Sequence, residues 1–284
     1  MDQTKQDNGT KMLLYGLVGA AIAYASGRIS GMLCVTLGLD AIMIPIAVRS
    51  AVAVIIFLLL GGGSWLRLDW KSIRHTWKFV RPLIIINLVL GCLTFLGILY
   101  GVFTGGLELA NTMSLAGYCT LLCLLVGINE EVMFRGLALG GLLAKMGDSK
   151  SGIIWSAVIS SIIFGAIHAV WDLDFTNGYS IATGAMKNLE TSMFAFIFCY
   201  PVIKGRNLWG AITAHGFFDW IILCGNTIAA GGMEAPTYVS TDPKLAMAAI
   251  AMFAVMAVLY APRTWRAVKE LKKLSLPQYG PIAK

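Results

Sequence analysis

Long runs of apolar residues alternate with short polar segments along the chain. Each run is close to the length of about 20 residues that an α-helix needs to cross the hydrocarbon core of a bilayer. The pattern predicts an all-α protein, a polytopic membrane bundle of about eight transmembrane helices. The predicted spans lie near residues 12–34, 41–61, 82–103, 113–145, 152–171, 181–203, 207–229 and 244–261.

The fourth apolar run is too long for one helix perpendicular to the membrane, so we expect it to tilt or to project beyond the bilayer. The segment before the third run, residues 65–82, mixes tryptophan with basic side chains. That mixture is typical of an amphipathic helix lying at the membrane interface.

Composition agrees with a membrane protein, because 57% of the 284 residues are hydrophobic and only 13% are charged. A soluble domain carries roughly 25% charged residues. The six cysteines occur at no metal-binding spacing and are expected to be small buried side chains. No internal repeat and no linker is visible, so we predict one integral membrane domain over residues 1–284.

Basic residues occur on alternate sides of the predicted spans. They lie in the second-to-third, fourth-to-fifth and sixth-to-seventh connections and after residue 261, whereas residues 104–112 and 172–180 contain none. Positive charge favours the cytoplasmic side, so both termini are predicted to be cytoplasmic. The net charge of +7 then faces anionic lipid, and no nucleic-acid partner is expected.

The N-terminal apolar run has an alternative interpretation. Lys11 and the small residues up to Ala25 resemble a signal peptide cleaved after Ala25. The chain continues apolar beyond that position, and the charge pattern already fits eight spans. We therefore interpret the run as a membrane anchor.

Polar residues inside the spans are unevenly distributed. The first three spans contribute only Arg28 and Arg49 as charges. Charged side chains within a membrane are costly, and a cluster of them indicates a functional site. Spans four, five and seven contribute Glu130, Glu131, Arg135, His168, His215 and Asp219.

Helical spacing separates the roles of these residues in the fourth span. Glu131 and Arg135 are four residues apart and lie on one helix face, where they can form a buried ion pair. Glu130 is rotated from its neighbour by about 100°. It has no evident partner in its own helix and is therefore the better candidate for a reactive carboxylate.

The fifth and seventh spans each carry a histidine with a neighbour four residues away. Phe164 and His168 share one face of the fifth span, and His215 and Asp219 share one face of the seventh. Counting along the helices places the polar groups roughly 12–25 Å deep, where they can meet in one cavity open to the cytoplasm.

A carboxylate and an imidazole can hold and deprotonate a water molecule, and a second imidazole can donate to a developing oxyanion. The sequence thus predicts hydrolysis inside a membrane. The same His/His/Glu set could bind zinc, but the HExxH spacing is absent. We expect no metal and no other cofactor.

These residues resemble three ordered motifs of one family. "EEVMFR", "FGAIH" and "HGFFD" are similar to the motifs EExxxR, FxxxH and HxxxN/D of the CAAX prenyl protease type II family, also called the CPBP or Abi family. The resemblance covers about residues 113–225. It implies an intramembrane endopeptidase of the glutamate type.

The resemblance also implies roles for individual residues. Glu130 and His168 would activate water, and His215 and Asp219 would occupy the oxyanion-hole positions. The implied supporting residues are Glu131, Arg135 and Phe164. Asp219 departs from the asparagine common at its position, so it would act either as a protonated donor or by orienting and charging His215.

The implied substrate is a prenylated protein C-terminus or another membrane-associated peptide, and the sequence leaves that choice open. Two other functions stay open as well. Intramembrane carboxylates and histidines also relay protons in proton-coupled transporters. A non-catalytic scaffold or bacteriocin-immunity protein would use the GxxxG spacings at Gly101/Gly105 and Gly136/Gly140 for helix packing.

Overall fold

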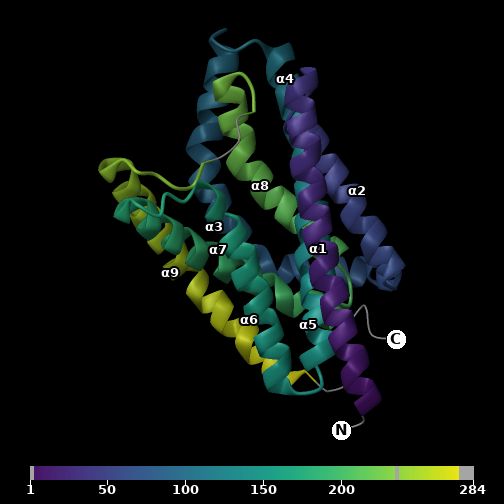
Figure 1. The fold of residues 1–284 in the computed structure, drawn as a ribbon. Coiled ribbons are helices and arrows are strands. Elements are labelled where there is room, and N and C mark those ends of the chain that lie inside the picture. Colours follow the sequence, from purple (N-terminus) through teal and green to yellow (C-terminus); the bar gives the residue numbers. More distant parts are fainter. Residues whose placement is uncertain (1–2, 234–236, 275–284) are drawn as a thin grey trace.

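The computed structural model describes residues 3–233 and 237–274 and is a bundle of helices (Figure 1). No strand occurs in these residues, which confirms the predicted all-α class. The α-helices are α1 (Gln3–Leu37), α2 (Met43–Leu59), α3 (Trp70–Phe103), α4 (Leu109–Glu130), α5 (Leu139–Met146), α6 (Lys150–Ile167), α7 (Gly178–Gly205), α8 (Trp209–Ala230) and α9 (Pro243–Lys273). The short helices are η1 (Gly62–Leu66), η2 (Glu131–Ala138) and η3 (Val170–Asp172).

Each predicted span coincides with a helix, and the fourth run forms one continuous helix from α4 through η2 to α5. Five of the described helices are long and apolar enough to cross a membrane: α1, α3, the α4–α5 helix, α6 with η3, and α9. The helix α2 is apolar but has 17 residues. Large apolar side chains such as Leu59, Leu93 and Phe103 are exposed on the outer faces, as expected of surfaces that contact lipid.

The amphipathic segment before the third span is continuous with that span from Trp70 onward. It forms the first turns of α3, which begins at Trp70 because the Asp69 side chain accepts a hydrogen bond from the backbone N–H of Lys71. The helix continues through Pro82 into the apolar run. Along these turns Ile73 and Phe79 are buried while Lys71 and Arg74 are exposed, which confirms the amphipathic character. The position of these turns at the membrane interface stays a prediction.

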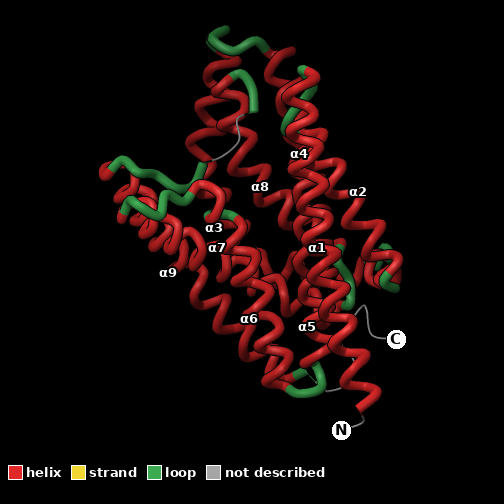
Figure 2. Tube along the Cα trace, in the orientation of Figure 1, coloured by secondary structure: helices red, strands yellow, loops and turns green. Residues whose placement is uncertain are grey.

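The helices form three neighbouring groups (Figure 1). In one group α7 packs between α9 and α6, and in another α1 packs against α2 and α5. Between them α8 packs against both α3 and α4. The longer loops, which follow α3, α6 and α8, lie toward the upper end of the bundle in Figure 2.

Glycines bring α4 and α8 into direct backbone contact. A Cβ atom on Gly216 would lie 2.7 Å from the carbonyl oxygen of Cys123, and one on Gly127 would lie 2.5 Å from that of Ile212. This crossing holds His215 next to the end of α4. The predicted GxxxG pairs do not make it, since Gly136 faces the ring of Phe57.

We expect Gly216→Ala to lower the stability of the protein, because the new methyl group must separate two backbones. Overpacking of this kind costs about 1–3 kcal/mol. Gly97→Ala in α3 is the matched control: nothing lies within 4 Å of its Cβ position, and alanine favours a helix more than glycine does. Thermal unfolding in detergent measures both variants, and equal melting temperatures would show that the crossing tolerates a side chain.

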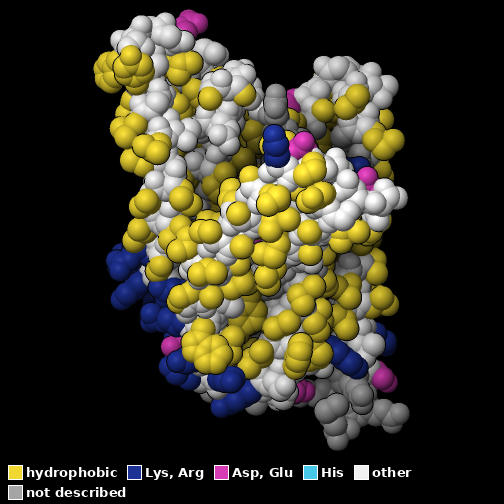
Figure 3. Space-filling model, turned by 90° about the vertical axis from the view of Figure 1, so that its left-hand side faces the viewer, with side chains coloured by type: hydrophobic (Ala, Val, Ile, Leu, Met, Phe, Trp, Pro, Cys, Tyr) yellow, Lys and Arg dark blue, Asp and Glu magenta, His cyan; other side chains and the backbone are white. Residues whose placement is uncertain are grey.

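The charges separate along the long axis of the bundle. Figure 3 shows apolar side chains over the middle of one face and Lys and Arg side chains gathered at its lower end, where Figure 1 places the α5–α6 connection and the last turns of α9. This distribution agrees with the sequence, in which basic residues occur in alternate connections between the predicted spans. The orientation remains a prediction, and both termini, residues 1–2 and 275–284, lie outside the described residues.

Cysteine labelling tests that orientation. In a variant without the six natural cysteines, single cysteines replacing Lys71 or Lys269 should be shielded from a membrane-impermeant thiol reagent in intact cells. A cysteine replacing Asp174, in the loop after α6, should be labelled. The opposite pattern would show that the basic end faces outward.

Candidate active site

The structure brings the candidate catalytic residues together from three helices. Glu130 is the last residue of α4, His168 directly follows α6, and His215 and Asp219 lie on α8. The helix α8 begins beside the basic α2–α3 connection, where the Asn207 side chain donates to the carbonyl of Arg67. Because an α-helix rises about 1.5 Å per residue, His215 and Asp219 lie about 9 and 15 Å from the start of α8.

The carboxylate of Glu130 lies between two imidazoles. Its Oε1 is 3.6 Å from Nε2 of His168, and its Oε2 is 3.5 Å from Nε2 of His215. Both separations exceed the usual length of a direct hydrogen bond. The side chain of Glu130 is 17% exposed, as is that of His168 at 19%, so both can meet a reactant.

Glu131 is fully buried and has the opposite environment. Its Oε1 lies 3.1 Å from Nη1 of Arg135, so the predicted ion pair is present. The same oxygen is 2.7 Å from Nδ1 of His215, a contact between residues 84 positions apart that the sequence did not predict. Since a carboxylate only accepts, Nδ1 of His215 carries the hydrogen, and Nε2 faces Glu130 and Asp219.

Arg135 has partners on three elements. Besides Glu131, its Nη2 donates to the carbonyl of Ala195 at 3.3 Å, and its Cζ lies 4.5 Å from the centre of the Phe164 ring. The side chain is 1% exposed. Arg135 therefore contacts Glu131, and almost none of its side chain is open to a bound molecule.

Asp219 lies beside His215 but too far from it for a close hydrogen bond. Its Oδ2 is 3.7 Å from Nε2 of His215, and its side chain is 20% exposed. The spacing of four residues did predict that the two share one helix face. The distance leaves Asp219 able to contact a bound molecule.

A π-helical segment shapes the site. The backbone over the eight residues of η2 is wound as a π-helix, which is rare and occurs mostly at functional sites. The carbonyl of Phe134 there accepts from Ser160 on α6 at 2.9 Å, as well as from the N–H of Leu139. Hydropathy does not distinguish a π-turn from an α-turn, so the sequence analysis missed it.

Aromatic rings surround His215 on its apolar side. The ring of Phe194 lies 5.1 Å away edge to face, and those of Phe164 and Phe198 lie 5.9 Å away. Phe164 also packs against His168 at 4.5 Å, and Nδ1 of His168 lies 2.8 Å from the carbonyl of Phe164. This wall excludes water from one side of the site and strengthens its electrostatic interactions.

An ion pair in the sixth predicted span was not predicted from the sequence. On α7, Nζ of Lys187 is 3.1 Å from Oε2 of Glu190, and it lies 4.3 Å from the ring centre of Tyr238. The ring of Tyr238 lies 6.3 Å from that of His168. The spacing of three residues between Lys187 and Glu190 would have revealed the pair.

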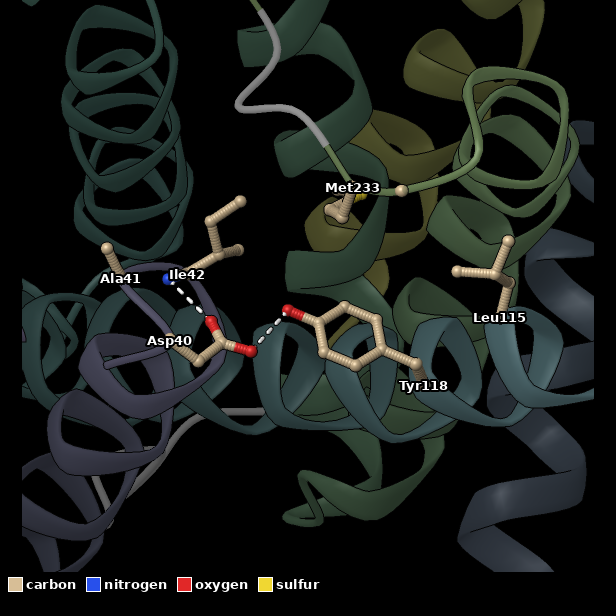
Figure 4. A pocket seen from close by; sticks show the side chains of 7 residues that line it. Asp40, Ala41, Ile42, Leu115, Tyr118 and Met233 are labelled. Atoms are coloured by element: carbon tan, nitrogen blue, oxygen red, sulfur yellow. Dashed lines mark hydrogen bonds between the residues drawn. The ribbon is translucent and has the colours of Figure 1, made fainter. Parts of the chain in front are cut away.

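An open pocket of about 390 Å³ lies away from these residues, between the α1–α2 connection, α4 and the end of α8 (Figure 4). Asp40 accepts there from the hydroxyl of Tyr118 at 2.9 Å and from the backbone N–H of Ile42 at 2.8 Å. These bonds tie the start of α2 to α4, and the pocket contains none of the candidate catalytic groups.

Metal binding and cysteine chemistry are not indicated by the arrangement. Within the described part of the chain, no three His, Cys, Asp or Glu side chains are placed to hold a metal ion together. All six cysteines are free, and all but Cys92 are buried. The absence of a metal cofactor stays a prediction about the reaction.

The fold and the site define an integral membrane protein with a carboxylate–imidazole cluster between its helices. Residues 112–221 match the family model described as "Type II CAAX prenyl endopeptidase Rce1-like". The match confirms the resemblance carried by the three motifs. It runs from α4 to α8 and contains every candidate site residue. No curated protein and no solved structure matches the chain.

Proposed function

We propose that the protein is an intramembrane endopeptidase of the glutamate type that hydrolyses a peptide bond of a membrane-associated substrate. The observation that carries the proposal is the position of Glu130 between His168 and His215, partly exposed and within 3.6 Å of both. The match to the Rce1-like family over this region supports the same activity.

In the proposed reaction Glu130 and His168 hold the attacking water. Glu130 takes one proton, and the hydroxide formed adds to the carbonyl carbon of the scissile bond. The proton then passes to the leaving amine as the bond breaks. Glu131 fixes the ring of His215 so that its Nε2 faces the reacting atoms, and as imidazolium this nitrogen donates to the oxyanion.

Cleavage of synthetic peptides by purified protein tests the proposal. A farnesylated peptide and its unmodified counterpart, reconstituted with the protein in lipid, separate a prenylated substrate from a general membrane peptide. We expect cleavage by the wild type and none by Glu130→Gln. Glu108→Gln, an exposed position before the first turn of the same helix, is the matched control. If neither peptide is cut and Glu130→Gln instead abolishes proton flux in liposomes, the protein is a transporter.

Asp219→Asn distinguishes two roles for that residue. If Asp219 donates a hydrogen bond to the oxyanion, the amide N–H supplies the same donor and activity should be retained or rise. This is the result we expect, measured as kcat/KM beside Asp219→Ala, which lacks any donor and should be slower. A hundredfold loss in Asp219→Asn, about 2.7 kcal/mol of transition-state stabilisation, would show that the charge on His215 depends on Asp219.

A further inference from the structure

Two arginines in the first two helices have no assigned task. Arg28 on α1 and Arg49 on α2 lie within predicted membrane spans, and neither forms an ion pair with a carboxylate of the described residues. The buried Nε of Arg49 has no hydrogen-bond partner. Charged side chains at this depth mark a functional site by default.

Aromatic rings hold both guanidinium groups in place. The Cζ of Arg49 lies 4.7 Å from the ring centre of Tyr24, and that of Arg28 lies 5.6 Å from the ring centre of Trp171. The two rings stack on one another at 5.6 Å and 13°. A Cβ atom on Gly27 would collide with the guanidinium of Arg49, so glycine makes room for it against α1. These residues form a cation–aromatic column built from α1, α2 and η3.

The column borders the active site. Trp171 lies in η3, three residues after His168. Ser50, next to Arg49, donates to the carbonyl of Leu125 at 2.9 Å, which ties this part of α2 to α4 five residues before Glu130. The other deep arginine, Arg135, already binds Glu131 and a backbone carbonyl. Nη1 of Arg135 also lacks a hydrogen bond, but it lies 3.1 Å from the Glu131 carboxylate. Arg49 keeps an unused donor and has no such carboxylate partner among the described residues.

We propose that Arg49, with Arg28 beside it, binds the C-terminal carboxylate of the peptide substrate. A guanidinium presents its donors in a planar fork that matches a carboxylate, and the surrounding rings keep water from competing. With its carboxylate held there, a peptide would extend from the column toward Glu130. The subsite would therefore select peptides whose scissile bond is a few residues from their C-terminus. The proposal rests on the proposed peptidase function, but both arginines lie outside the region matched by the family.

Binding measurements test the subsite without requiring turnover. The probe is a fluorescent farnesylated peptide with three residues after the modified cysteine, made with a free C-terminal carboxylate or with an amide. Affinity is measured for the Glu130→Gln protein in nanodiscs of zwitterionic lipid. We expect the carboxylate form to bind at least tenfold more tightly, and Arg49→Gln in the same background to remove that preference. Arg28→Gln should reduce it, and exposed Arg74→Gln on α3 should leave it unchanged.

Several results would overturn the inference. If the Glu130→Gln protein with both arginines intact binds the two peptides equally, no carboxylate is recognised. An equal loss for both peptides in Arg49→Gln, together with a lower melting temperature, would assign the arginine to packing. A preference for anionic over zwitterionic lipid that depends on Arg49, with equal binding of the two peptides, would assign it to a lipid headgroup.

Turnover by the protein with Glu130 intact separates this inference from the proposed function. With hydrolysis present, Arg49→Gln should raise KM for the carboxylate peptide about tenfold while leaving kcat and the amide peptide nearly unchanged. A carboxylate preference without hydrolysis would support the subsite and contradict the peptidase. Hydrolysis without any preference would contradict the subsite alone.

Discussion

Glu130→Gln and His168→Ala should each reduce peptide cleavage by about a thousandfold or more while leaving the protein folded. General acid–base catalysis by a positioned group contributes roughly 10²–10⁴ in rate. The two side chains are proposed to act on the same water, and each is partly exposed, so neither replacement leaves a fully buried charge without a partner. Single-turnover cleavage and the melting temperature measure the two effects separately.

The double variant gives the sharper result. Residues that act as a unit are strongly non-additive, so Glu130→Gln combined with His168→Ala should cost little more than either change alone. Rate losses that multiply would show that the two side chains work in separate steps. Near-normal turnover by either single variant would remove that residue from the water-activating role.

Local periodicity was sufficient to predict most of the architecture. Each apolar run became a helix, and the spacing of four residues correctly paired Glu131 with Arg135 and placed His215 and Asp219 on one helix face. Helix ends were less predictable because single side chains decide them. The Asp69 cap, for example, starts α3 twelve residues before the predicted span.

The sequence predicted which residues form the site better than which contacts they make. The bond between Glu131 and His215 joins η2 to α8, and no pattern within either helix specifies it. It depends on the close crossing at Gly127 and Gly216, which two isolated glycines in apolar runs do not reveal. The column of Arg49 and Tyr24 likewise depends on Trp171 in η3, and no pattern within a single helix specifies its contact with α1.

Glu131 contributes to both the stability and the proposed chemistry of the site, because one of its carboxylate oxygens contacts both Arg135 and the imidazole of His215. Its pairing with Arg135 keeps the buried charge compensated, and its bond to His215 sets the direction of Nε2. The two contacts explain why this motif helix carries adjacent glutamates with different burial.

Arg135→Ala should therefore destabilise the protein as well as inactivate it. Removing one partner of a buried ion pair costs about 3–5 kcal/mol, because the other charge is left without compensation. Here the change also removes a donor from the carbonyl of Ala195 and a cation from the face of Phe164. We expect a clearly lowered melting temperature, poor expression and low activity.

Two further variants identify the cause of that loss. Arg135→Lys keeps the charge but not the planar fork, so its stability should lie between the alanine variant and the wild type. Adding Glu131→Gln to Arg135→Ala removes the orphaned charge, and the double variant should recover much of the lost stability while remaining inactive, since His215 is no longer held by a carboxylate. An Arg135→Ala protein as stable as the wild type, and inactive only toward peptides that end in a carboxylate, would instead place Arg135 on the substrate in the position that we assign to Arg49.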